Sequence, residues 1–252
     1  MPDVNDLRVK IFADGADLDD ISRLSKNPII KGFTTNPTLM RKANVSDYRA
    51  FAMDVLDIVP ERPVSFEVFS DEFTEMEQQA MELASWGKNV YVKIPVSTTH
   101  GEFSGPLVRR LSEAGVQVNV TALMTAEQVE MVADCLSDQT NSIVSVFAGR
   151  VADSGRDPVP IMAKSVKLLR PNKKAELIWA SPRELFNIFQ ADSVGCHIIT
   201  ATTDVLAKLP TVGKDPDTYS LETVQMFRDD ALAAGYTIDL SQSIPAQYKV
   251  TS

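Results

Sequence analysis

Residues 90–121, VYVKIPVSTTHGEFSGPLVRRLSEAGVQVNVT, contain the unit that decides the fold. The two ends, VYVKI and VQVNV, are short runs rich in β-branched residues, which is typical of buried strands. Between them, PLVRRLSEAG has the spacing of an amphipathic helix. A strand, a helix and a second strand in this order predict two parallel strands joined by a crossover helix.

The same alternation runs along the whole chain. Strands are predicted at 9–13, 29–35, 64–68, 90–94, 116–120, 142–147, 176–180 and 197–201, with helical segments between them. Eight such strands in 252 residues favour a single (β/α)8 barrel. The alternative is an open doubly wound sheet, but no GxGxxG follows a strand, which argues against its dinucleotide-binding form.

The chain shows no linker rich in Pro, Gly or Ser and no strong internal repeat. We therefore expect a single domain over residues 1–252. Its barrel would span about 8–210, and an additional C-terminal helix and tail would span about 218–252.

Composition limits the partners and the location. A net charge of −9 argues against nucleic acid and anionic membranes, whereas a small anionic substrate remains compatible with a few arginines in one pocket. Cys135 and Cys196 are too far apart to predict a disulfide or a zinc site, so both are expected to be buried. The N-terminus lacks an apolar signal-peptide core and no segment is apolar over roughly 20 residues, so the cytoplasm is expected.

In a barrel strand, alternate side chains point inward, and those near the carboxyl end face the active-site mouth. In VYVKI the apolar Val90, Val92 and Ile94 share one face, which leaves Lys93 on the other face with Tyr91. Other polar residues fit the same scheme: Asp14, Thr34, Asn36, Glu67, Asn119, Thr121 and Ser145, with Arg150 just beyond a strand.

Lys93 is the most informative of these residues. Burying an ammonium group costs several kcal/mol unless it is paired or its pKa falls. One hypothesis is a buried ion pair with Glu67 or Asp14. The other is a partly neutral lysine that attacks a carbonyl and forms a Schiff base. Asp14 and Glu67 would then either carry protons or act as plain counter-ions.

Six segments together resemble the transaldolase family, particularly its short forms related to the fructose-6-phosphate aldolases. The resemblance covers about the first 205 residues. It is carried by FADGAD (12–17), GFTTNPT (32–38), VKIP (92–95), VNVTALMT (118–125), SVFAGR (145–150) and WASPR (179–183).

The resemblance implies a role for each matching residue. Lys93 would be the Schiff-base nucleophile, and Asp14 the acid/base for C–C cleavage and formation. Glu67 and Thr121 would hold a water that relays protons. The dihydroxyacetone unit would be bound by Asn36, Asn119 and Ser145, with support from Thr34, and the phosphate by Arg150, Ser181 and Arg183. No metal or organic cofactor is implied, because the imine serves as the electron sink.

Two positions bear on the activity within the family. The aldolase branch has Gln where this chain has Glu67, and Tyr where it has Phe147. We therefore expect a transaldolase that transfers a dihydroxyacetone unit from a ketose phosphate, such as fructose 6-phosphate, to an aldose phosphate. The alternatives are an aldolase that releases free dihydroxyacetone, a transaldolase-like enzyme with another sugar, and a non-catalytic sugar-phosphate-binding barrel, which the intact site residues disfavour.

The chain also departs from the family pattern. The loop 96–105 is longer than usual and is expected over the pocket mouth, with His100 exposed to solvent. The segment after Ser181 is shortened, which makes Arg183 a less secure phosphate ligand than Arg150. The identity of the donor and acceptor sugars is therefore left open. In short family members the C-terminal helix packs against a neighbouring subunit, so a homo-oligomer is expected.

Overall fold

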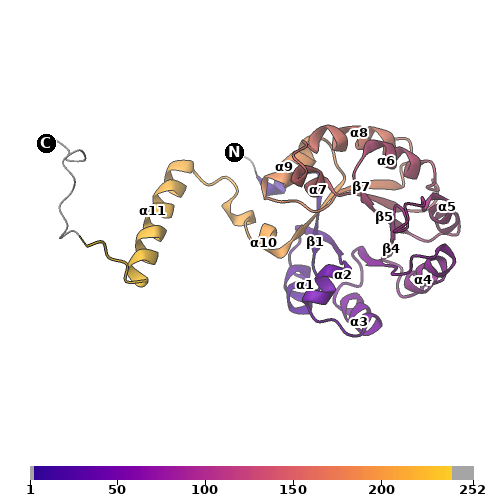
Figure 1. The fold of residues 1–252 in the computed structure, drawn as a ribbon, viewed down its shortest axis with the longest axis horizontal. Helices are drawn as coiled ribbons and strands as arrows, with labels where there is room; N and C mark the ends of the chain where they lie inside the picture. Colours follow the sequence, from indigo (N-terminus) through magenta and orange to yellow (C-terminus); the bar gives the residue numbers. More distant parts are fainter. Residues whose placement is uncertain (1–2, 240–252) are drawn as a thin grey trace. The chain divides into compact units, whose positions relative to one another are not determined.

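The computed structural model describes residues 3–239. Up to Pro210, its centre is a closed barrel of parallel strands in sequential order (Figure 1). The strands are β1 (Lys10–Asp14), β2 (Ile30–Thr34), β3 (Val64–Glu67), β4 (Val90–Pro95), β5 (Val118–Leu123), β6 (Ser142–Val146), β7 (Ala175–Trp179) and β8 (Ile198–Thr202). Because β1 also pairs with β8, the sheet has no open edge, and the (β/α)8 prediction is confirmed over the doubly wound alternative.

Helices surround the barrel (Figure 1). They are α1 (Leu18–Ser25), α2 (Pro37–Lys42), α3 (Tyr48–Ile58), α4 (Phe73–Ser85), α5 (Gly105–Glu113), α6 (Ala126–Ala133), α7 (Ala148–Asp153), α8 (Val159–Leu169), α9 (Phe186–Ser193) and α10 (Thr203–Leu206), with 3-10 turns η1 (Val4–Asp6) and η2 (Leu209–Thr211). The sequence did not predict α2 and α7, because six residues are too few to show helical periodicity.

The two faces of each strand separate as the alternation predicts. Val92 and Ile94 are fully buried in the large core between barrel and helices. Tyr91 belongs to a smaller cluster inside the barrel with Phe12 and Ile178. This packing fixes the register, since a slip of one residue would move Lys93 from the inner to the outer face. Cys135 and Cys196 are buried and unpaired, as predicted.

Residues 211–239 belong to a second compact unit, built around α11 (Pro216–Ala233). Asp215 caps this helix by accepting a hydrogen bond from the backbone N–H of Thr218 at 2.9 Å. No α11 residue is buried, and several large apolar side chains are exposed: Tyr219, Leu221, Val224, Met226, Phe227 and Leu232. The predicted tail from residue 240 lies outside the described residues. Of the helices that the structure describes, none has the length and apolarity to cross a bilayer.

Candidate active site

A cavity of about 500 Å³ opens at the carboxyl ends of the strands. Every residue that the sequence suggested as catalytic or substrate-binding lines it: Asp14, Thr34, Asn36, Glu67, Lys93, Asn119, Thr121, Ser145, Phe147, Arg150, Ser181 and Arg183. The carboxyl end is the face where (β/α)8 barrels carry their active sites. Residues far apart in the sequence therefore converge on one site.

The strand register places Lys93 between Glu67 on β3 and Asn119 on β5. Lys93 is 7% exposed, and its Nζ donates to the Thr35 carbonyl oxygen at 2.7 Å. The same Nζ lies 3.3 Å from Glu67 Oε2, so the buried ion pair that the sequence allowed is present. The Lys93 side chain also lines the cavity, so a carbonyl group bound there would lie next to an amine.

Asp14, at the end of β1, is a carboxylate whose environment raises its pKa. Burial raises the pKa of Asp14, against the charge of Lys93 and the hydrogen bond from Thr34, which lower it. Thr34 Oγ1 donates to Asp14 Oδ1 at 2.7 Å and lies 2.6 Å from Thr200 Oγ1. Since the Thr34 proton is directed at Asp14, Thr200 is the donor in the second bond. A carboxyl group with a raised pKa in a cavity is suited to exchanging protons.

The amide of Asn119 is fixed by both of its ends. Its Nδ2 donates to Ser65 Oγ at 3.1 Å, and its Oδ1 accepts from Ser145 Oγ at 2.7 Å. Asn119 is fully buried, so these bonds satisfy polar atoms that water does not reach. Two members of this hydrogen-bonded row, Asn119 on β5 and Ser145 on β6, line the cavity, and Ser65 on β3 supports them.

Two further residues at the strand ends are held by local backbone features. Asn36 Oδ1 accepts from the Leu39 N–H at 3.0 Å and so caps α2. Thr121 Oγ1 donates to the Ile94 carbonyl oxygen at 3.4 Å, and Thr121 lies within a register shift in β5, between Val120 and Leu123. Ala122, within that shift, has a φ of 65°, a left-handed conformation that costs an alanine roughly 1 kcal/mol.

The two arginines at the rim have different environments. The guanidinium of Arg150, on α7, lies 5.2 Å from the centroid of the Phe147 ring. Arg183 is instead held by Asp153, with Nε 2.9 Å from Oδ1 and Nη2 2.5 Å from Oδ2. Arg150 is thus the freer of the two to bind a phosphate, in agreement with the ranking from the sequence.

Gly149 allows the segments that carry these arginines to approach each other. A Cβ at Gly149 would lie 1.5 Å from the carbonyl oxygen of Ser181. Ser181 itself has a φ of 56°, a conformation that is uncommon for a residue with a side chain. The missing Cβ in one segment and the left-handed turn in the other bring α7 and the end of β7 together.

Sequence reasoning missed several residues that support the site. Thr200 could have been found, because it shares the inward face of β8 with Ile198. Nothing in the sequence pattern pointed to Tyr48. Its hydroxyl accepts from the Glu67 N–H at 2.8 Å and lies 3.1 Å from the Glu67 carbonyl oxygen. Only the packing of α3 brings the hydroxyl to this position. Asp153, the partner of Arg183, was likewise invisible in the sequence.

The long loop after β4 does not cover the cavity, contrary to the expectation from the sequence. The cavity lining includes Pro95 and no residue of 96–105. Instead, the loop closes on itself, because Ser97 pairs with Phe103. The Thr99 N–H also donates to Asp71 at 2.7 Å, which ties the loop to the segment between β3 and α4. The side chain of His100 is 89% exposed, as predicted. Among residues 3–239, no three His, Cys, Asp or Glu side chains form a metal-ligand cluster.

The closed barrel and the lysine-centred cavity at its carboxyl face define a (β/α)8-barrel protein with a candidate active site at the carboxyl ends of its strands. The chain belongs to the transaldolase/fructose-6-phosphate aldolase family, whose sequence model matches residues 11–243.

Individual relatives agree with this assignment. A protein of Thermoanaerobacter sp. named "Probable transaldolase" is 33% identical over 231 residues, which cover 91% of this chain and all of that protein. A protein of the same name from Dehalococcoides mccartyi is 32% identical over 202 residues, covering 80% of this chain and 90% of the relative. Among solved structures, 2,3-dimethylmalate lyase superposes with a TM-score of 0.53 at 11% identity, covering 97% of this chain and 90% of that one. That likeness concerns the fold alone.

Proposed function

We propose that the chain is a transaldolase that transfers a dihydroxyacetone unit from a ketose phosphate, such as fructose 6-phosphate, to an aldose phosphate through an imine on Lys93. The observation that most supports this proposal is the position of Lys93. Its buried Nζ lies 3.3 Å from Glu67, in a cavity that extends to Arg150. An amine nucleophile, proton carriers and a phosphate ligand in one cavity are the parts that this reaction needs.

In this proposal the neutral amine of Lys93 adds to the C2 carbonyl of the ketose. The carbinolamine loses its C2 oxygen as water, and Glu67, with a water held by Thr121, supplies and removes the protons. Lys93 is already in contact with Glu67 when the substrate arrives, so no rearrangement is needed for this transfer.

Asp14 then accepts the proton of the C4 hydroxyl. The C3–C4 bond breaks, its electrons move into the iminium group to give an enamine, and the aldose phosphate leaves. The acceptor aldehyde enters, the enamine carbon adds to it, and Asp14 returns the proton to the new alkoxide. Water then adds to C2 of the product iminium, and the resulting carbinolamine expels the amine of Lys93, which releases the new ketose phosphate and regenerates the free lysine. The raised pKa of Asp14 supports this role, because a carboxylate that is costly to keep charged is a better base.

The enamine must be retained until the acceptor binds. Asn36, Asn119 and Ser145 would hold its hydroxyl groups, with Thr34 supporting Asp14. Arg150, Ser181 and Arg183 would bind the phosphates of donor and acceptor in turn, since the charged fork of an arginine suits phosphate oxygens.

The second candidate is an aldolase of the same architecture that releases free dihydroxyacetone. Glu67 and Phe147 favour the transferase, because the aldolase branch carries Gln and Tyr at these positions. We further propose that the enzyme acts in the cytoplasm as a homo-oligomer; the exposed apolar side chains of α11 support the second point.

Borohydride trapping tests the proposal. The protein is incubated with fructose 6-phosphate, reduced, and mapped by mass spectrometry. A three-carbon adduct on the peptide that contains Lys93 is expected, and erythrose 4-phosphate added before reduction should discharge it. Lys93→Met should abolish the adduct, whereas Lys88→Met, a change at an exposed lysine just before β4, should not. An adduct that forms equally in Lys93→Met would refute the imine, and an adduct that water discharges as fast as the acceptor does would favour the aldolase.

A further inference from the structure

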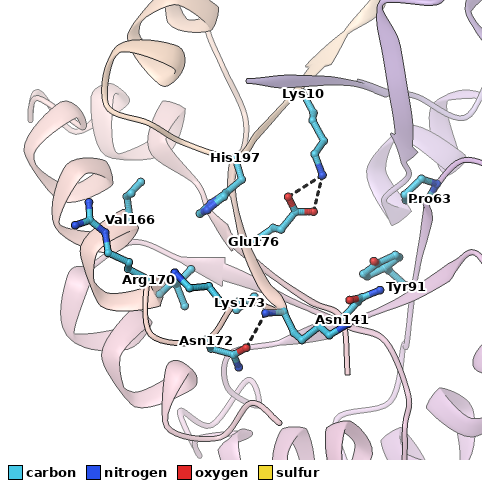
Figure 2. Close-up of a pocket in the computed structure, with 13 residues that line it drawn as sticks. Lys10, Pro63, Tyr91, Asn141, Val166, Arg170, Asn172, Lys173, Glu176 and His197 are labelled. Atoms are coloured by element: carbon cyan, nitrogen blue, oxygen red, sulfur yellow. Dashed lines mark hydrogen bonds and ion pairs between the residues drawn. The ribbon is translucent and has the colours of Figure 1, made fainter. Parts of the chain in front are cut away.

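The amino-terminal end of the barrel contains a second cavity, of about 470 Å³ (Figure 2). It lies at the start of β1, β7 and β8, opposite the end that carries Lys93. Four basic residues line it, Lys10, Arg170, Lys173 and Lys174, against one acidic residue, Glu176. This is a positive pocket in a chain whose net charge is −9.

Three of these basic side chains have no anionic partner among the described residues. Lys10 donates to both oxygens of Glu176, at 2.7 and 2.9 Å, and this pair neutralises one side of the cavity (Figure 2). Within residues 3–239, Arg170, Lys173 and Lys174 take part in none of the ion pairs. Three such cations at one concave surface attract anions.

The turn that presents the lysines is anchored. Asn172 Oδ1 accepts from the Lys174 N–H at 2.9 Å, and its Nδ2 donates to the Ser137 carbonyl oxygen at 3.1 Å. Arg170 follows the last residue of α8. Asn172 thus holds the backbone of this turn. When a ligand binds, only the side chains of Lys173 and Lys174 in the turn need to become ordered, which lowers the entropy cost of ligand binding.

The inner wall adds neutral donors. His197 Nδ1 accepts from the Leu177 N–H at 3.0 Å, so the neutral ring carries its proton on Nε2. Burial lowers the pKa of His197, which favours this neutral form. Burial also raises the pKa of Tyr91 to about 12, so its hydroxyl, beside Asn141 in Figure 2, keeps its proton. Charged groups at the mouth and neutral donors deeper inside are suited to a phosphate group, whose oxygens accept from both.

We propose that this cavity is a second anion site that binds phosphate or a small phosphate-bearing molecule, separate from the cavity around Lys93. The site does not depend on the proposed function, since none of its residues lines the other cavity.

The two histidines of the chain allow a local test. His197 lines the second cavity, whereas His100 lies in the exposed loop after β4. Pyrophosphate is titrated into the full-length protein while the imidazole signals are followed by ¹H–¹⁵N NMR, with chloride as the control for ionic strength. His100→Gln assigns the two signals. The expected result is a saturable shift of the His197 signal with little change at His100.

A triple variant, Arg170→Ala, Lys173→Ala and Lys174→Ala, should weaken the binding seen at His197 at least tenfold. A matched triple variant, Lys26→Ala, Arg156→Ala and Lys167→Ala, removes the same charge from positions outside the cavity and should leave it unchanged. Lys174→Glu alone should also weaken pyrophosphate binding. This single variant is used in place of the first triple variant if the triple variant does not fold. A His197 signal that does not respond to pyrophosphate, or that responds equally in both triple variants, would overturn the proposal. Trapping at Lys93 is read out separately, so either proposal can fail alone.

Discussion

The amine of Lys93 lies 3.3 Å from the carboxylate of Glu67, and adjacent strands hold the two residues in register. Glu67 is itself held through its backbone by the hydroxyl of Tyr48. The position of the carboxylate next to the amine is therefore set by both the sheet and a helix. This relationship gives the first prediction.

Glu67→Ala should keep the fold and lower the rate of imine formation by roughly 10²- to 10⁴-fold, because it removes the polar side chain that handles the protons of the carbinolamine. The rate is measured by borohydride trapping at short times. Glu61→Ala, which removes a carboxylate from an exposed ion pair, is the control. An unchanged trapping rate would remove Glu67 from proton transfer and leave it as a counter-ion.

Asp14→Asn should separate two steps of the reaction. Imine formation should persist while C–C cleavage slows by roughly 10²- to 10⁴-fold, so reduction should trap an uncleaved six-carbon adduct. Mass spectrometry distinguishes this adduct from the three-carbon unit in the unaltered protein. If the variant accumulates the three-carbon adduct at the normal rate, Asp14 is not the base.

The same variant should change the pH dependence of stability. The pKa of Asp14 is raised above its usual 3.8 in the folded protein, so the folded state binds more protons than the unfolded state between these two values. Stability of the unaltered protein should therefore fall, relative to Asp14→Asn, as the pH rises through this interval. Urea unfolding at a series of pH values measures the difference. A stability of the unaltered protein that increases relative to Asp14→Asn as the pH rises would contradict the raised pKa.

Gly149→Ala should destabilise the barrel by about 2 kcal/mol, because its Cβ would overlap the Ser181 carbonyl oxygen. Relief of the overlap would move Arg150 away from Ser181, and the KM for phosphorylated sugars should rise. Gly15→Ala is the control for stability, since no atom lies within 4 Å of its Cβ. Equal unfolding midpoints for the two variants would show that the close approach is not required.

Arg150→Ala should raise the KM for phosphorylated substrates by roughly 10- to 100-fold, the range expected for a lost charge-assisted hydrogen bond. Arg183→Ala should have a smaller effect, because Asp153 already neutralises that guanidinium. Steady-state kinetics with phosphorylated and unphosphorylated sugars provide the comparison. A larger effect for Arg183→Ala, or an equal effect on unphosphorylated sugars, would contradict these roles.

The sequence by itself determined the barrel and the residues of its cavity. Strand periodicity is local, and in a closed parallel barrel the inward residues at the strand ends must converge. The strand pattern alone therefore places Lys93, Asp14 and Glu67 together. The motifs around them extended this set to Arg150 and Arg183 at the rim.

The tertiary structure decided what these residues contact. The bond of Tyr48 to Glu67, the pairing of Arg183 with Asp153 and the course of the loop 96–105 depend on how separate elements pack. The cavity at the amino-terminal end also arises only from packing, because Lys10, Tyr91 and Lys174 meet there from three segments. Such contacts follow from long-range geometry, which a local pattern of apolar and polar residues does not encode.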